Sequence, residues 1–380
     1  MKKNIKREYQ VCTNCVMDTS DSKIVFDSKG VCDHCNNFYT KILPNWHPDE
    51  NSKKELESTF AKIKKTHAKK KYDCIIGVSG GVDSSYLVYL AKQYGLRPIL
   101  YSVDVGWNDP VANENIRKLV EYSGFDFYVN KVDERQFMDF QLSFLKSQIS
   151  NVDIQDFMIF SGLYSFAVKN KIKYILTGGN FSTESCREPV EWVGLGIDTK
   201  LVRDIRKKFS TIKWDKLSFV GIFKYKIFYK YFKGIKVVHP LNKIPYSKQL
   251  AIKTLREETG WQTYKNKHFE SVFTRFFEGY WLIKKFGFDK RRAHFSSLIL
   301  SGQLRREEAL EILKEPPYPE SEAQKDMEYI VKKIGISVEE FKNFMEQPNK
   351  TIADYKSSAR LINLGAKVLK LFGKEKRNLR

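Results

Sequence analysis

The stretch from Tyr72 to Ser85 (YDCIIGVSGGVDSS) joins a short apolar run to a polar, glycine-rich turn. Two adjacent glycines let the backbone approach a phosphate closely, and a helix that begins at the turn directs free N–H groups toward it. No Gly-Lys-Ser/Thr follows, so the turn is not a Walker loop. The candidate phosphate-binding residues are Ser79, Gly80, Gly81, Asp83, Ser84 and Ser85. Among them, Asp83 has the carboxylate to hold Mg²⁺ against the phosphates.

Four cysteines near the N-terminus have the spacing of metal ligands. Cys12 and Cys15 form one CxxC pair, and Cys32 and Cys35 form a second. Each pair can place two thiolates on one turn, and two pairs complete a tetrahedral shell around Zn²⁺. Because all four positions are filled by protein, we expect the zinc to be structural. Disulfides are the alternative, but a cytoplasmic chain keeps its thiols reduced.

The elements that position these residues alternate between strand-like and helix-like patterns. Apolar runs predict strands at 74–78, 97–103, 125–132, 172–177 and 235–239. The alternation predicts an α/β fold with a doubly wound parallel sheet, which binds ligands beyond the carboxyl ends of its strands. Four further residues follow predicted strands and are expected to face the same crevice: Asp104, Gly178, Gly179 and Asn180.

Helix boundaries are also readable from local chemistry. Asp109 and Ser247 are predicted N-caps, and Gly124 and Gly260 are predicted helix ends. The region after 260 reads as helical. Its expected elements are a helix over Lys267–Phe286, a capping box at Ser337-x-x-Glu340 and an amphipathic helix over Ser357–Phe372.

We divide the chain into three regions. Residues 1–48 form the four-cysteine zinc-ribbon module, 49–246 the α/β domain, and 247–380 a helical region for substrate or partner binding. The N-terminal MKKNIKREYQ is charged and precedes no apolar segment, so we expect no signal peptide and a cytoplasmic location.

The chain is strongly basic, with 66 Lys and Arg against 45 Asp and Glu and a net charge of +21. This balance suits polyanionic partners without choosing among them. An insert at about 200–236 holds twelve Lys and Arg, two Asp and many aromatic residues. It is compatible with a packed helical hairpin, with peripheral contact to an anionic membrane, or with RNA binding, the last being the least favoured.

The heptad SGGVDSS resembles the pyrophosphate loop (PP-loop) of the ATP pyrophosphatase superfamily. The resemblance implies cleavage of ATP between its α and β phosphates, with ATP bound by the turn and strand-end residues named above. An oxygen of the substrate becomes adenylylated, pyrophosphate leaves, and a nucleophile then displaces AMP.

Longer motifs resemble the N-acetyl sugar amidotransferase family of bacterial surface-polysaccharide (O-antigen-type lipopolysaccharide) synthesis. The match covers roughly residues 8–315. It is carried by the Cys pairs, SGGVDSS, VDVGWN, TGGNFSTES at Thr177–Ser185, GWQTYKNKHFES at Gly260–Ser271, and KFGFDKRRAHFSSLILSGQLRREEAL at Lys285–Leu310. The resemblance implies that ATP and ammonia convert a nucleotide-linked acetamido sugar to an acetamidino sugar. It also implies a separate glutaminase, similar to that of histidine biosynthesis, as the source of ammonia.

Charged residues in these last two stretches are candidates for the reaction itself. Lys267, His268 and Glu270, with Asp83, are candidate catalytic residues, because they can handle charge and protons during ammonia attack. The candidates for binding the sugar nucleotide are Arg275, Lys290, Arg291 and Arg292. For each of them an ordinary surface charge or salt bridge is the alternative.

A tRNA-thiolating enzyme is the alternative function, because such enzymes share the loop and the zinc knuckles. It needs cysteines to carry sulfur, and Cys74 and Cys186 remain outside the two CxxC pairs. Cys74 lies in the first predicted strand. Cys186 follows the Gly-Gly-Asn turn, where a sulfur carrier could lie.

Overall fold

The computed structural model describes residues 8–194, 196–264, 267–362 and 364. Its centre is a five-stranded sheet with the order β3-β2-β1-β4-β5, in which every neighbouring pair is parallel. The strands are β1 (Cys74–Gly77), β2 (Pro98–Asp104), β3 (Phe127–Lys131), β4 (Tyr174–Leu176) and β5 (Lys236–Val238). All five predicted strands therefore exist, and the predicted parallel α/β sheet is confirmed.

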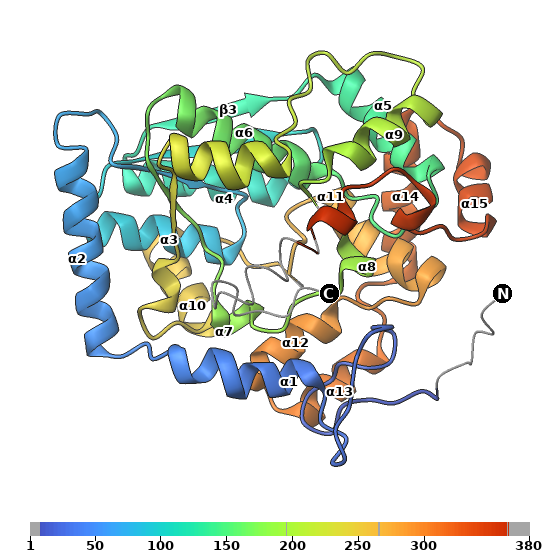
Figure 1. Ribbon diagram of the computed structural model, residues 1–380, viewed down its shortest axis with the longest axis horizontal. Coiled ribbons are helices and arrows are strands. Elements are labelled where there is room, and N and C mark those ends of the chain that lie inside the picture. The colour runs from blue at the N-terminus through green and yellow to red at the C-terminus, as the bar shows by residue number, and fades with distance from the viewer. Residues whose placement is uncertain (1–7, 195, 265–266, 363, 365–380) are drawn as a thin grey trace.

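Helices cover both faces of this sheet because successive side chains of a strand point to opposite sides. Cys74 and Ile76 of β1 pack in one buried cluster, whereas Ile75 between them packs in the other. The first cluster includes residues of α2 (Glu50–Thr66), α3 (Val82–Gln93), α4 (Pro110–Ser123) and α10 (Lys248–Thr259). The second includes residues of α5 (Glu134–Lys146), α6 (Gln155–Lys169) and α9 (Thr199–Phe209). The sheet is doubly wound (Figure 1).

The predicted caps of α4 and α10 are confirmed. Asp109 accepts a hydrogen bond from the backbone N–H of Val111, and Ser247 accepts one from that of Leu250. Gly124 and Gly260 end these helices with φ values of 71° and 68°, in the left-handed region that favours glycine.

The N-terminal module packs against helices that come late in the sequence (Figure 1). It contains α1 (Asp33–Asn37), η1 (Phe38–Ile42) and η2 (Leu43–Asn45). Its cysteines share a buried cluster with Ala293 and Leu300 of α12 (Arg291–Leu300). Arg306, at the start of α13 (Arg306–Lys314), donates to the carbonyls of Cys12 and Cys15 at 2.8–3.2 Å. Segments far apart in the sequence are thus held together.

The C-terminal region is helical, as predicted, although one boundary was wrong. Residues 267–270 are not helical; Ser271 caps α11 (Val272–Phe276), which continues as the π-helix η5 (Phe277–Phe286). At Ser337 the hydroxyl accepts from the N–H of Glu340, as a capping residue should. The remaining helices are α7 (Phe181–Glu184), α8 (Val190–Val193), η3 (Lys224–Phe232), η4 (Pro240–Asn242), α14 (Glu320–Ile334), α15 (Val338–Glu346) and η6 (Ile352–Asp354).

The predicted helix over Ser357–Phe372 lies largely outside the described residues. Within the described ranges, no helix combines the length and the apolar character needed to cross a membrane. The three-region division remains a prediction.

Candidate active site

A cavity of about 640 Å³ opens at the carboxyl ends of β1, β2 and β4. The glycine turn lines its floor with Ser79, Gly81, Asp83 and Ser84. Helix α3 begins at Val82 with Gly81 as its N-cap, so its first backbone N–H groups are directed toward the turn. This arrangement provides hydrogen-bond donors and a positive helix end for an anion such as a phosphate.

The turn is held from two sides. Gly80 has φ of 83°, and its carbonyl accepts a hydrogen bond from Trp261 Nε1 at 3.0 Å. On the other side Gly178 packs on the loop backbone, because a Cβ added there would lie 2.9 Å from the carbonyl carbon of Asp83. Any larger residue at 178 would push the two strand ends apart.

Asp83 is the centre of a partly buried charge cluster. The Tyr246 hydroxyl donates to Asp83 Oδ1, and Lys267 Nζ lies 4.0 Å from Asp83 Oδ2. Lys267 Nζ also lies 2.6 Å from Glu184 Oε1. Burial raises the pKa of Asp83. Burial would also raise the pKa of Glu184, but the positive charge of Lys267 has the larger effect and lowers it. Two carboxylates thus share one lysine on the cavity wall.

A second pair lies beside the glycine turn. His268 Nδ1 is 3.8 Å from Glu270 Oε1, and that oxygen accepts from the Ser79 hydroxyl at 3.4 Å. Burial alone would lower the pKa of His268, but the carboxylates of Glu278 and Glu270 raise it to about 8. His268 has φ of 65°, an uncommon conformation for a residue with a side chain, and such strain is frequent at functional sites.

A third group of charged side chains surrounds Lys290. Lys290 Nζ lies 2.6 Å from Glu278 Oε1 and 3.1 Å from Glu188 Oε1. His294 Nε2 is 3.0 Å from the same Glu188 oxygen, and burial lowers the pKa of His294. Lys290, Glu278 and His294 also line an adjoining cavity of about 230 Å³, whose remaining wall is largely apolar. The two cavities share Thr183, Lys248, Lys267, Glu278 and Lys290.

Part of the sequence has a known counterpart. Residues 270–369 match the family model described as "LPS biosynthesis protein WbpG-like, C-terminal domain". Residues 270–369 are therefore similar to this domain, and we refer to them as the WbpG-like domain. This similarity agrees with the predicted resemblance to proteins of lipopolysaccharide biosynthesis over this part of the chain. The WbpG-like domain supplies Glu270, Glu278 and Lys290 to the cavity that the glycine turn also lines.

Solved structures give distant likenesses. A predicted tRNA methyltransferase subunit from Methanocaldococcus jannaschii shares 14% identity over 48% of this chain and 74% of its own, with a TM-score of 0.28. An NH3-dependent NAD synthetase from Campylobacter jejuni shares 16% sequence identity, and the alignment covers 71% of this chain and 99% of the synthetase, with a TM-score of 0.31. An NMN synthetase from Francisella tularensis shares 14% sequence identity, and the alignment covers 59% of this chain and 100% of the synthetase, with a TM-score of 0.25. No curated protein matches the chain. These likenesses are too distant to indicate a function.

Several predicted binding residues lie beside the cavity and have other contacts. Asp104 accepts from the N–H of Gly106, and Asn180 caps α7. Gly178 and Gly179 line the cavity, whereas Gly80 and the buried Ser85 are not among the described lining residues. In the structure, Asp104 and Asn180 therefore stabilise the backbone of the segments that follow β2 and β4.

Three predicted sugar-nucleotide ligands do not reach the main cavity. Arg275, on the first helix of the WbpG-like domain, pairs with Asp109 at 2.6 Å and Asp326 at 2.7 Å. Arg291 pairs with Asp289 and lines only the adjoining cavity. Arg292 pairs with Asp18 of the N-terminal module at 2.9 Å. Of the four predicted substrate-binding cations, Lys290 alone lines the main cavity.

Cys186 is buried away from both cavities. It shares an apolar cluster with the N-terminal cysteines, and its backbone N–H donates to Ser297 Oγ at 3.0 Å. Cys74 is fully buried in β1. Neither thiol is among the described residues that line the main cavity. The geometry thus gives no support to a sulfur-carrying role for either residue.

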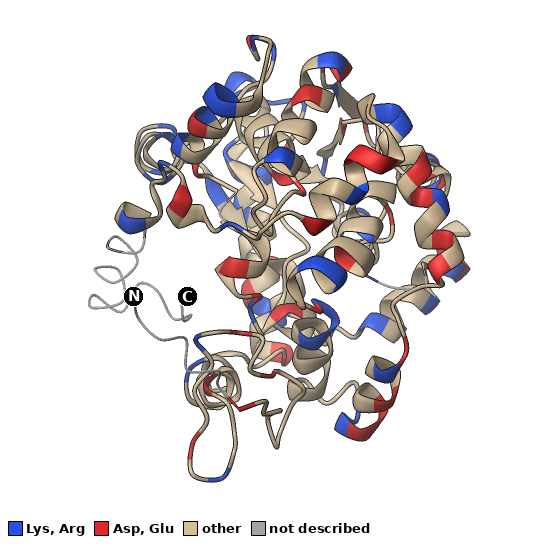
Figure 2. Cartoon of the chain, turned by 90° about the vertical axis from the view of Figure 1, so that its right-hand side faces the viewer, with Lys and Arg blue, Asp and Glu red and all other residues tan. Residues whose placement is uncertain are grey.

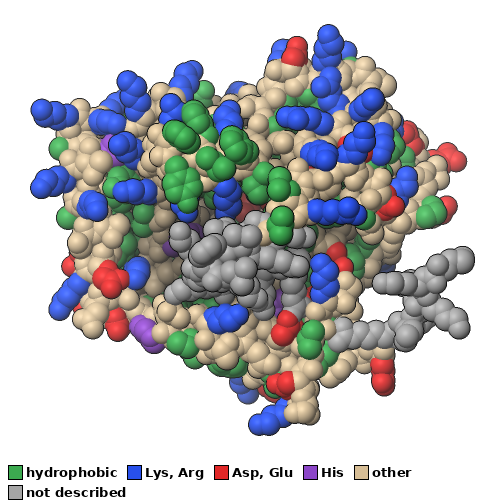
Figure 3. All heavy atoms as spheres, viewed as in Figure 1, with side chains coloured by type: hydrophobic (Ala, Val, Ile, Leu, Met, Phe, Trp, Pro, Cys, Tyr) green, Lys and Arg blue, Asp and Glu red, His purple; other side chains and the backbone are tan. Residues whose placement is uncertain are grey.

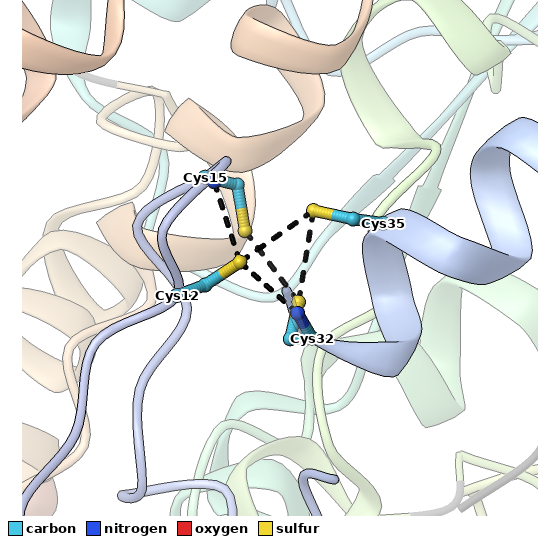
Figure 4. A group of neighbouring side chains, drawn as sticks. All are labelled: Cys12, Cys15, Cys32 and Cys35. Carbon is cyan, nitrogen blue, oxygen red and sulfur yellow. Dashed lines mark hydrogen bonds between the residues drawn. The ribbon is translucent and has the colours of Figure 1, made fainter. Parts of the chain in front are cut away.

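The N-terminal cysteines converge on one point (Figure 4). Their sulfur atoms lie within 4.8 Å of one another, with separations of 3.8 Å for Cys12–Cys35 and 3.7 Å for Cys15–Cys32. A tetrahedron with Zn–S bonds of about 2.3 Å has edges of about 3.8 Å, so the donor set fits Zn²⁺. The backbone N–H groups of Asn14 and Cys15 donate to Cys12 Sγ, as suits a thiolate.

Sequence reasoning did not single out several charged and polar residues of the cavity wall. Glu184 stands inside the motif TGGNFSTES, yet no role was predicted for it. A carboxylate a few residues past a glycine turn at a strand end was the available signal. The other cavity residues that sequence reasoning did not single out include Asp153, Gln155, Asp156, Glu188, Lys248 and Glu278. Burial raises the pKa of Asp156 to about 6.

Proposed function

We propose that this protein is an ATP-dependent amidotransferase of lipopolysaccharide biosynthesis. It would adenylylate the acetamido oxygen of a nucleotide-linked N-acetyl sugar and replace that oxygen with ammonia, giving an acetamidino sugar. The observation that carries the proposal is the shared cavity: the SGGVDSS turn and the WbpG-like domain line the same 640 Å³ space. A nucleotide loop and a polysaccharide-specific segment thus meet at one place.

ATP would lie with its phosphates on the glycine turn. The N-terminus of α3, the Ser79 and Ser84 hydroxyls and Lys248 offer positive or donor groups there. Asp83 and Glu184 offer the oxygen ligands that Mg²⁺ prefers, so they would hold the metal. Bound Mg²⁺ would neutralise charge on the departing pyrophosphate.

An acetamide carbonyl is a poor electrophile because its nitrogen donates electron density into it. In the first step the amide oxygen attacks the α phosphorus, the bond to the β-phosphate oxygen breaks, and pyrophosphate leaves. The product is an O-adenylyl imidate. Lys267, 2.6 Å from Glu184 and 4.0 Å from Asp83, would stabilise charge on the phosphates during this step.

In the second step ammonia adds to the imidate carbon, and the C–O bond to AMP breaks. The amide oxygen therefore leaves with AMP, and the added nitrogen must lose a proton. The neutral form of His268, which is populated as the pH approaches its pKa of about 8, would accept that proton, with Glu270 orienting the ring. Lys290, held by Glu278 and Glu188, would bind an anionic group of the sugar nucleotide.

Mass spectrometry tests the proposal directly. Acetamido sugar nucleotides would be incubated with the protein, ATP, Mg²⁺ and ammonium, and each sugar nucleotide would be weighed before and after. We expect one of them to lose one mass unit, the difference between O and NH, with one AMP and one pyrophosphate formed per product. Turnover with a tRNA and a sulfur donor, and none with any acetamido sugar nucleotide, would favour the thiolating alternative.

The ammonia donor is part of the proposal. We expect a separate glutaminase, similar to that of histidine biosynthesis, to deliver ammonia to this chain. The chain alone should then use concentrated ammonium, faster as the pH rises, and should not use glutamine. Adding the glutaminase should make glutamine sufficient near neutral pH. Use of glutamine by the isolated chain would contradict this part of the proposal.

A further inference from the structure

The insert presents an exposed aromatic and basic surface that the proposed reaction does not use. Five side chains of the segment around η3 form its apolar part, and three of them are at least 68% exposed. We call the following residues the η3 patch: Phe223, Ile227, Phe228, Tyr231 and Phe232, with Lys224, Lys226, Lys230, Lys233 and Lys236. Figure 3 shows hydrophobic side chains gathered among lysines on the upper part of this face.

Helix geometry separates this outer face from an inner one. η3 is a π-helix, which has more residues per turn than an α-helix, so 223, 227–228 and 231–232 recur on one side. The inner side holds Tyr225 and Tyr229. The Tyr225 ring lies 4.7 Å from that of Phe160 on α6, and Tyr229 is 3% exposed. A helical insert whose aromatic residues pack inward was one interpretation of the sequence, and only the inner side of η3 has this packing.

The charge along the segment that forms the patch has one sign. From Lys216 to Arg256 the sequence contains no Asp or Glu. The patch lysines are exposed, and two of them lie against patch rings: Lys230 Nζ is 5.6 Å from the Tyr231 centroid and Lys233 Nζ is 5.1 Å from the Phe228 centroid. Lysine stems that lie along apolar surface while their ammonium groups reach outward are typical of residues at a membrane interface.

We propose that the η3 patch docks this protein on an anionic lipid surface. Phenylalanine and isoleucine side chains would enter the headgroup boundary, and the lysines would meet lipid phosphates. A second copy of the chain is a poorer occupant, because a two-fold contact would oppose five lysines to five lysines with no carboxylate between them. RNA is also less favoured, because Ile227 and the patch phenylalanines offer no hydrogen bonds to bases or phosphates.

Vesicle sedimentation tests this inference independently of turnover. The full-length protein is mixed with vesicles of phosphatidylcholine alone, or with about one third phosphatidylglycerol. We expect binding to the anionic vesicles at least about tenfold stronger, weakened by salt. Phe223→Ser/Phe232→Ser and Lys230→Glu/Lys233→Glu should each weaken binding at least about tenfold while circular dichroism stays unchanged.

Matched controls lie elsewhere on the surface. Val25→Ser/Leu250→Ser removes two exposed apolar side chains, and Lys62→Glu/Lys65→Glu reverses two exposed lysines of α2. Both should leave vesicle binding within about twofold. The proposal is wrong if the natural protein stays in the supernatant, or if control and patch variants lose binding equally. Concentration-dependent dimerisation or RNA binding that only the patch variants lose, without vesicle binding, would also overturn it.

Discussion

Lysines gather in two places, the cavity and the η3 patch, and their surroundings are opposite. In the cavity, Lys267 and Lys290 each lie within 2.6 Å of a carboxylate and are largely buried. In the patch, five exposed lysines have no acidic neighbour in the sequence from Lys216 to Arg256. On the side of the molecule that is at the right in Figure 1, acidic and basic segments are interspersed (Figure 2).

The difference separates two uses of positive charge. A buried lysine between carboxylates is fixed in position, so it can stabilise charge that develops at one atom during a reaction. An exposed lysine without acidic neighbours keeps its mobility and acts on a distant anionic surface through the net field. Variants of the two lysine groups should therefore fail in different assays.

Asp83→Asn should have the largest effect on the reaction. It removes a carboxylate next to Lys267 and Glu184 and, in our proposal, a ligand of Mg²⁺. We expect pyrophosphate release to fall at least about a thousandfold, with the fold and the zinc content intact. The control is Asp126→Asn, which removes an exposed carboxylate paired with Lys71. If Asp83→Asn and Asp126→Asn turn over equally, Asp83 has no part in the mechanism.

Lys290→Met tests the cavity side of the comparison through stability. It would leave Glu278 and Glu188 buried beside each other without their shared cation. Breaking a buried ion pair on one side costs about 3–5 kcal/mol. Lys230→Met in the patch should change the free energy of unfolding by less than about 0.5 kcal/mol. Urea denaturation followed by tryptophan fluorescence measures both, and similar midpoints would show that the Lys290 cluster is not a buried network.

Features with local causes were predictable from the sequence. The strands followed from apolar runs, and the caps at Asp109 and Ser247 followed from side chains that bond backbone groups two or three residues away. The long helix predicted from Lys267 was wrong because Ser271 supplies a stronger start signal. Of the four preceding residues, Lys267, His268 and Glu270 line the main cavity and Phe269 lines the adjoining one, and His268 lies in the left-handed region.

Partners of charged side chains were not predictable in this way. Arg275 and Arg292 were interpreted as substrate ligands, yet their carboxylate partners Asp326 and Asp18 lie far away in sequence. Lys290 lines the main cavity because Glu188 and Glu278, also distant or on another helix, hold it there. Only tertiary packing decides whether a cation is paired or available, and no spacing rule encodes it.

Cys32→Ser should affect catalysis less than the cavity variants. It removes one of four thiolates, and metal binding contributes to folding of such modules. Zinc per protein, measured by atomic absorption, should fall from one to near zero, and unfolding should occur at lower urea. Turnover should fall by less than about tenfold, because the four-cysteine site lies outside the cavity. Normal zinc content in this variant, or none in the natural protein, would contradict the structural-zinc prediction.

Among the stability effects, the change that His268→Gln makes to the free energy of unfolding should be the smallest, and it depends on pH. The pKa of His268 is raised from 6.5 to about 8 in the folded protein. A raised folded-state pKa stabilises the fold fully below pH 6.5, and this contribution is lost as the pH rises through 8. Because the side chain is 37% exposed, solvent screening limits the contribution to below about 1 kcal/mol. The free energy of unfolding of the natural protein minus that of His268→Gln should therefore be larger at pH 6 than at pH 9.

A difference that grows with pH would mean that Glu270 and Glu278 do not hold a charged His268. His239→Gln, which changes a histidine that contacts the Gly179 carbonyl instead of a carboxylate, serves as the control.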